Sequence, residues 1–340
     1  MDAPIPDLAE RADACAEHLR SADRVVLASH IDADGLTSAA IAATALERAE
    51  IPFRTVFSKQ LDAEEIAGIA ELEPDTVLFT DFGSGQLDII AEHEAAGDFT
   101  PVIADHHQPA AAESDDTDDP DTEFHLNPLL FGINGASELS GAGASYVLAR
   151  ALEPEGVDNR DLAALAVVGA VGDMQASGGE LHGANERIVE EGVDAGVLET
   201  ATDLALYGKQ TRPLPKLLEY SSDVNIPGIS NDQSGALSFL DGLDLDLKSG
   251  GEWRRWVDLD DDERQTVASA LVQRAVSRGV PADKIDGLVA TTYALADESV
   301  GTELRDASEF STLLNATARY ERADVGLAVC LGDRDGALDC

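Results

Sequence analysis

Short apolar runs alternate with a helix-like stretch in the first third of the chain. Residues 24–29 (RVVLAS), 76–80 (TVLFT) and 101–104 (PVIA) have the length and composition of buried strands. Between the first two, residues 36–49 (LTSAAIAATALERA) have helical spacing and composition. Because buried strands that alternate with helices form parallel sheets, this pattern predicts an α/β fold with a parallel sheet.

Helical patterns dominate the middle of the chain. We expect helices over 141–152 and 160–171, the second of which leads into the GDM tripeptide at 172–174. The segment 196–280 is predicted to be mainly helical and is interrupted by prolines. From Asp286 onward, the stretches DGLVATTYA and VGLAVCLGD predict the start of a smaller α/β unit.

The length fits two globular units, since domains commonly run about 100 to 200 residues, and the chain has 340. The pattern predicts a parallel-sheet domain at 1–195, a helical connector at 196–280 and a partial second α/β domain at 281–340. Residues 111–123 (AAESDDTDDPDTE) are expected to form a solvated acidic loop without a function of its own.

The net charge of −43 is spread over helical segments as well as this loop. Self-repulsion of this size is tolerable when molar salt shortens the screening length to about 3 Å. We therefore infer a halophilic source. Acidity normally disfavours nucleic-acid partners, but that objection weakens if the acidity is an adaptation to salt.

Several other classes of protein are disfavoured by composition. No apolar run approaches the roughly 18 residues that span a bilayer, and the N-terminus lacks a basic and apolar leader, so we expect a cytoplasmic protein that does not contact membranes. The cysteines, Cys15, Cys330 and Cys340, are too scattered for a disulfide framework or a cysteine zinc site.

Acidic residues and histidines follow each predicted strand directly. Since ligands bind at the carboxyl ends of open α/β sheets, residues that are distant in sequence can meet there. A further aspartate, Asp173, follows the helix at 160–171 and can close the same site. The strand-end residues are His30, Asp32, Asp34, Asp81, Asp105, His106 and His107.

Carboxylates with two or three imidazoles form the donor set expected for a pair of divalent ions, best suited to manganese, with magnesium as a substitute. Such a pair supports phosphoester hydrolysis without a serine or cysteine nucleophile. Taken singly, HIDADG could be a helix-capping turn, the adjacent histidines a surface pair, and Asp81 and Asp173 helix N-caps. Their coincidence at one sheet edge favours a metal site. The remaining histidines, which lack this context, are His18, His93, His125 and His182.

Four segments resemble the motifs of the DHH phosphoesterases, in order: SHIDADGLTSA, FTDFGSG, ADHHQP and AVVGAVGDM. HLNP at 125–128 and LSGAGASYVL at 139–148 resemble the nuclease branch of that superfamily, and RDASEFSTLLNATARYERADVGLAVCLGD is similar to the archaeal RecJ-like proteins. The resemblance implies a DHH domain, a helical connector and the start of a DHHA1-like domain.

The resemblance also implies roles for individual residues. His30, Asp32, Asp34, Asp81, His106 and Asp173 would bind two metal ions, with Asp81 as the bridging carboxylate. Asp105 would orient His106, as metal-bound imidazoles usually require. His107 would face the scissile phosphate or the leaving group.

Substrate contacts are expected at two places. The amides near Gly141 and Gly143 begin a helix and would attract phosphate, or these small residues would serve packing. Arg305, Asn315 and Arg319 are the candidates in the partial DHHA1-like domain, or they lie on helix surfaces. That domain lacks the family's glycine-rich motif ending in histidine, through truncation or loss.

The resemblance implies a single-strand-specific exonuclease that releases 5′-mononucleotides in the 5′ to 3′ direction from DNA or RNA. A second hypothesis with the same metal centre is a small-substrate phosphoesterase for nanoRNA, phosphoadenosine phosphate or a cyclic dinucleotide. A third is an accessory subunit of a replicative helicase complex, with GINS-type replisome proteins as partners. Because this chain keeps every expected ligand, catalysis is favoured over a purely structural role.

Overall fold

The computed structural model describes residues 3–110, 123–176, 179–221 and 224–334. Most of the predicted acidic loop therefore lies outside the described residues. The chain divides into two compact units. The first contains residues 1–176, 181–197 and 311–340, and the second contains 177–180 and 198–310.

The first unit is built on a five-stranded parallel sheet of order β2-β1-β3-β4-β5, which confirms the predicted fold class. The strands are β1 (Val25–His30), β2 (Phe53–Ser58), β3 (Thr76–Thr80), β4 (Thr100–Ala104) and β5 (His125–Leu126). Thr80 lies opposite both Ser29 and Ala104, so the carboxyl ends of the three central strands are level. Residues that follow these strands meet at one edge of the sheet.

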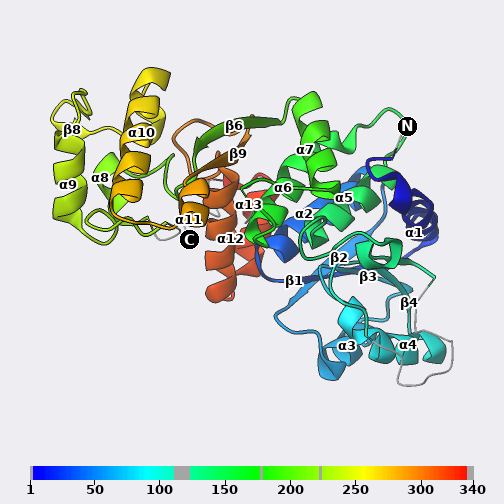
Figure 1. The fold of residues 1–340 in the computed structure, drawn as a ribbon. Helices are drawn as coiled ribbons and strands as arrows, with labels where there is room; N and C mark the ends of the chain where they lie inside the picture. The colour runs from blue at the N-terminus through cyan, green and yellow to red at the C-terminus, as the bar shows by residue number, and fades with distance from the viewer. Residues whose placement is uncertain (1–2, 111–122, 177–178, 222–223, 335–340) are drawn as a thin grey trace. The chain divides into compact units, whose positions relative to one another are not determined.

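Helices cover both faces of this sheet (Figure 1). On one face lie α3 (Ala63–Ala70) and α4 (Leu87–Ala96), whose isoleucines and leucine pack with Phe79 and Ile103. The opposite face carries α1 (Ala9–Ser21), α2 (Ala33–Arg48), α5 (Gly141–Ala151) and α6 (Ala163–Gly172). The remaining helices of this unit are α7 (Ala184–Asp194), α13 (Ala323–Cys330) and the 3-10 helices Pro6–Leu8, Ser84–Gln86, Pro128–Phe131 and Asn159–Leu162.

Helix α2 is almost entirely buried because alanines line it on every side. Gly326 of α13 approaches it so closely that an added Cβ would lie 2.6 Å from Leu36 Cδ1. The absence of a side chain at Gly326 thus lets α13 pack closely against the first turns of α2.

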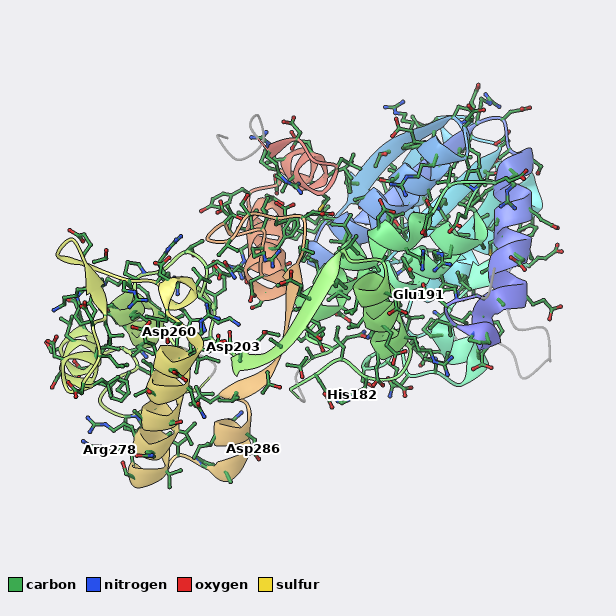
Figure 2. All side chains as sticks on the ribbon, turned by 90° about the horizontal axis from the view of Figure 1, so that it is seen from above. His182, Glu191, Asp203, Asp260, Arg278 and Asp286 are labelled. Atoms are coloured by element: carbon green, nitrogen blue, oxygen red, sulfur yellow. The ribbon has the colours of Figure 1, made fainter. Side chains whose placement is uncertain are left out.

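The second unit joins an antiparallel ribbon to a small helical core. Its strands are β6 (Leu198–Leu204) paired with β9 (Val289–Leu295), and the short hairpin β7 (Lys248–Ser249) with β8 (Glu252–Trp253). Its helices are α8 (Leu214–Glu219), α9 (Gln233–Asp241), α10 (Asp261–Ser277), α11 (Ala282–Asp286) and the 3-10 helix Trp256–Asp258. The buried Trp256 donates its indole N–H to Asp203 of β6, 3.0 Å away, and Asp260 caps α10 (Figure 2).

This division differs from the expected boundaries at 195 and 280. The segment expected to be a helical connector contains β6, whose partner β9 lies in the segment expected to begin a separate α/β domain. Helix α12 (Ala307–Arg319) begins in the second unit, and residues from 311 onward belong to the first. The polar sequence of β6, LETATDL, does not resemble a buried strand, and its pairing with β9 is a long-range contact.

Within the described residues, no helix is long and apolar enough to cross a membrane.

Candidate metal centre

The predicted ligands meet at the carboxyl edge of the sheet. His30 ends β1, Asp32 caps α2 by accepting the Gly35 N–H, and Asp34 lies in the first turn of that helix. Asp81 follows β3 with a left-handed backbone, at φ of 59°, which aspartate tolerates better than most residues. Asp173 stands at the carboxyl end of α6, and Gly83, not Asp81, is the N-cap of the 3-10 helix Ser84–Gln86. Neither aspartate is therefore a helix N-cap.

Three overlapping groups of donor atoms form within this cluster, with ligand atoms within 4.8 Å of one another in each. His30, Asp32 and Asp81 make the first group, and Asp34, His106 and Asp173 make the second. The third group, Asp81, Asp105, His106 and His107, shares Asp81 with the first and His106 with the second. In the first group, His30 Nδ1 lies 3.1 Å from Asp32 and 3.5 Å from Asp81.

The first two groups, which we call the ligand groups, are joined through Asp81. Its Oδ1 lies 3.3 Å from His106 Nε2, and its Oδ2 is the oxygen that faces His30. His106 Nε2 lies 3.6 Å from Asp34 Oδ2. The Asp81 carboxylate therefore presents one oxygen to each group, which is the arrangement expected of a bridging ligand.

His106 is oriented by a backbone carbonyl. Its Nδ1–H donates to the Gly135 oxygen at 2.7 Å, so Nε2 points at the carboxylates. The side chain of Gln175 donates both to that carbonyl and to Asp173. Burial lowers the pKa of His106, but the hydrogen bond to Asp81 and the charges of Asp34 and Asp81 raise it overall to about 11.

This finding corrects one expected role. Asp105 does not orient the His106 ring. It accepts the Nδ1–H of His107 at 2.8 Å, together with the backbone N–H groups of Ser84, His106 and His107. Burial raises the pKa of Asp105, but the hydrogen bond and charge of His107 outweigh it and hold the carboxyl well below its usual range.

Asp34 is held by the start of α5. Its two oxygens accept the backbone N–H groups of Gly141 and Ala142, at 2.8 and 3.0 Å. Gly143 N–H instead donates to Ser140 Oγ, the cap of that helix. The amides proposed to bind phosphate are thus occupied within the protein, and the structure does not support substrate contacts for Gly141 and Gly143.

Gly141 serves close packing instead. A Cβ at this position would lie 2.4 Å from Asp81 Oδ1, and a Cβ at Gly169 would lie 2.5 Å from Asp34 Oδ1. Only residues without a side chain let α5 and α6 approach the carboxylates this closely. The missing side chains of Gly141 and Gly169 therefore leave the space that the carboxylates of Asp81 and Asp34 occupy.

His107 is the exposed member of this cluster. Its side chain is 55% exposed, and since Nδ1 is bonded to Asp105, the free ring nitrogen is Nε2. Asp105 is supported by Ser84, whose hydroxyl contacts His125 Nε2 and Asn127 Nδ2 at 2.9 and 2.8 Å. His125 is fully buried and belongs to this supporting network, although its sequence context gave no reason to select it.

The other predicted substrate contacts differ from one another. Asn315 Oδ1 accepts the Ala33 N–H at 3.0 Å, so it supports the turn between Asp32 and Asp34. Arg305 is buried, and its guanidinium donates to the carbonyls of residues 295, 296 and 298 and to Glu199. Arg305 thus ties strand ends together and is not available to substrate. Arg319 is exposed at the end of α12.

The donor set fits divalent ions. Burial, followed by the charge of Asp81, raises the pKa of Asp34 well above its usual value, and burial raises that of Asp173. Closely spaced carboxylates of this kind repel one another unless cations lie between them. Mixed carboxylate and imidazole donors suit manganese, and magnesium is the harder alternative.

Comparison with known proteins places the chain in a family. Residues 24–170 match the N-terminal domain of the DHH family, and residues 206–289 match the DHH-CID domain. The chain belongs to the DHH family, and its fold is RecJ-like.

An uncharacterised protein of Methanocaldococcus jannaschii is 29% identical over 308 residues, which are 90% of this chain and 63% of that protein. A structure of exonuclease RecJ bound to manganese matches with a TM-score of 0.54 and 19% identity, over 100% of this chain and 65% of that one. CDC45 from Entamoeba histolytica matches with a TM-score of 0.61 and 12% identity, over 95% of this chain and 71% of that one. The chain thus spans less than two thirds of the length of the first two relatives.

Proposed function

We propose that this protein is a metal-dependent phosphodiesterase that cleaves single-stranded nucleic acid as an exonuclease. The observation that carries the proposal is the junction of two ligand groups through Asp81, whose oxygens lie 3.5 Å from His30 and 3.3 Å from His106. Two manganese ions, or magnesium in their place, would be held by His30, Asp32, Asp34, Asp81, His106 and Asp173. Such ions supply Lewis-acid chemistry for phosphoester hydrolysis.

The protein's own contribution is to fix these donors before substrate arrives. Asp34 is held by two backbone N–H groups, His106 by a carbonyl and Asp173 by the Gln175 amide. Rigid positioning of this kind removes much of the entropic cost of assembling the reacting groups.

Proton transfer is assigned to His107. Asp105 accepts its Nδ1–H, which leaves Nε2 to donate a proton to the leaving oxygen or to take one from an attacking water. The exposed ring can reach a substrate phosphate, whereas the buried Asp105 cannot. Asp105 is therefore a positioning residue for His107.

The resemblance of the sequence motifs to RecJ-like nucleases implies single-stranded DNA or RNA as substrate and 5′ to 3′ release of 5′-mononucleotides, and the fold likeness to exonuclease RecJ is compatible with this. A small-substrate phosphoesterase with the same ligands is the alternative within the enzyme class. The likeness to CDC45 supports a second candidate function, association with replisome proteins of the GINS type, which is compatible with catalysis at this site.

The test is a single panel of substrates. The full chain, in manganese and high salt, is given 5′-labelled and 3′-labelled single-stranded DNA and RNA, short dinucleotides and a cyclic dinucleotide. Asp81→Asn serves as the inactive control, because asparagine keeps the shape of the side chain and tolerates the left-handed backbone. We expect mononucleotides from the single strands and none from the variant. Equal activity of Asp81→Asn and the parent would refute the proposed centre, and activity on dinucleotides alone would favour the small-substrate alternative.

A further inference from the structure

A cavity of about 410 Å³ opens beside the metal centre. Its lining includes the ligands His30 and Asp81 and the neighbouring His107. It also includes Lys59, Gln60 and Leu61, which follow β2, and Phe82 and Gln86, which follow β3. The volume lies within the range of about 300 to 1,000 Å³ that is typical of small-molecule sites.

Lys59 reaches this cavity because of the sheet topology. Ser58, the last residue of β2, lies opposite His30 at the end of β1, so the next residue starts from the same edge of the sheet as the ligands. The turn after β2 is fixed locally, since Ser58 Oγ donates to the Gln60 carbonyl at 2.8 Å. Leu61, buried to 4% exposure, anchors the end of this turn in the core.

The charge of Lys59 is not used within the described protein. Its side chain is exposed, and among the described residues it has neither a hydrogen bond nor an ion pair. Lys59 is one of only 23 basic residues in a chain with 66 acidic ones. A lysine ammonium is a compact point charge that suits phosphate oxygens.

The wall of the cavity suits a nucleobase. Phe82 and Leu61 supply apolar surface beside the polar cluster, and both belong to the core packed against α3 and α4. Around them stand the amides of Gln60, Gln86 and Gln108, each of which can donate and accept hydrogen bonds. Apolar walls with a few amides can hold an aromatic base without demanding one particular base.

We propose that this cavity binds the nucleoside of the nucleotide whose phosphate lies at the metal centre, and that Lys59 binds a phosphate oxygen of that nucleotide. The inference rests on the proposed function and names the part of the substrate recognised at the same site. It makes Lys59 a substrate-binding residue and the wall at Leu61 and Phe82 the base-binding surface.

The experiment measures binding and hydrolysis separately. Affinities for thymidine 5′-monophosphate and for deoxyribose 5-phosphate are measured by calorimetry, with magnesium present, at one fixed salt concentration. The proteins are the full-length parent, Lys59→Ala, Lys59→Arg and the matched control Lys284→Ala. Lys284 is exposed in the second unit, and its loss changes the net charge by the same amount.

We expect the parent to bind the nucleotide more tightly than the sugar phosphate. Lys59→Ala should weaken the binding of both by about tenfold, the loss typical of one exposed charge-assisted hydrogen bond. Lys59→Arg should recover most of the affinity, and Lys284→Ala should match the parent. The melting temperature of Lys59→Ala should stay unchanged, because the side chain is exposed and makes no hydrogen bond or ion pair among the described residues.

Equal affinities of the parent for the two ligands would overturn the base-binding surface, and an unchanged affinity in Lys59→Ala would overturn the role of Lys59. Hydrolysis of bis(p-nitrophenyl) phosphate by the same preparations tests the proposed function by itself. A parent that binds the nucleotide but hydrolyses no phosphodiester would refute the proposed function and leave the nucleotide site supported.

Discussion

Replacing Gly141 by alanine tests whether the position of the Asp81 carboxylate controls the site. The new Cβ would lie 2.4 Å from Asp81 Oδ1 and 2.9 Å from its Cγ. Ordinary van der Waals contact begins near 3.4 Å, so helix α5 and the carboxylate must separate by about 1 Å.

The backbones of Asp81 and Gly141 are both held in place. The N–H of Asp81 donates to the Ala104 carbonyl at 3.0 Å, and the N–H of Gly141 donates to the Asp34 carboxylate. Overpacking of this kind costs about 1 to 3 kcal/mol of stability. A displacement of about 1 Å at reacting groups reduces rate by about 10²-fold. We therefore expect a folded protein with weakened metal binding and a large loss of turnover.

The assay is turnover on a labelled single-stranded oligonucleotide across a manganese titration, together with a thermal melt. The matched control is Gly68→Ala in α3, where an added Cβ meets nothing within 4 Å and which should gain up to about 1 kcal/mol of stability from helix propensity. Turnover of Gly141→Ala at the level of the parent and the control would refute the bridging role of Asp81.

Three further predictions follow from other contacts. His107→Ala should keep its bound ions, because the ring is exposed, and lose about 10² to 10⁴ in rate; loss of ions, measured by elemental analysis, would make His107 a ligand. Arg305→Ala should lower the free energy of unfolding by about 2 to 4 kcal/mol, because it leaves buried carbonyls unpaired. The control Arg319→Ala removes an exposed side chain and should change this free energy little. Equal effects of the two variants in urea titrations would contradict the assigned role of Arg305. The melting temperature should rise from dilute to molar salt, because the charge of −43 needs screening; a maximum in dilute buffer would refute this.

The strand ends could be located from sequence because their signal is local. Apolar runs that stop at a histidine or an acidic residue predicted β1, β3 and β4 to within a residue or two, and strand polarity then predicted that Asp81 and Asp105 would meet at one edge. Strand β2 gave no such signal. It runs along the edge of the sheet, so its sequence FRTVFS alternates with polar residues and no side chain in it is fully buried.

The hydrogen bonds that orient His106 and His107 could not be predicted, because they join residues that only the folded chain brings together. Gly135 has no property in the sequence that marks it as the partner of His106, yet a Cβ there would lie 2.1 Å from the His106 carbonyl oxygen. The two adjacent histidines also take different partners, one a carbonyl and the other Asp105. The motif gives the residues, and tertiary contacts determine which ring faces which group.

The local charge balance explains how so acidic a chain could bind the phosphodiester proposed as its substrate. Four carboxylates line the two ligand groups, Asp32, Asp34, Asp81 and Asp173, and the pair of divalent ions proposed for them would balance their charge. The fifth carboxylate, Asp105, is already paired with His107. A phosphate at this edge of the sheet would therefore meet a neutral centre with an adjacent lysine, while the acids elsewhere lie beyond a screening length of about 3 Å in molar salt. The total charge of −43 thus does not determine the affinity of this site for nucleic acid.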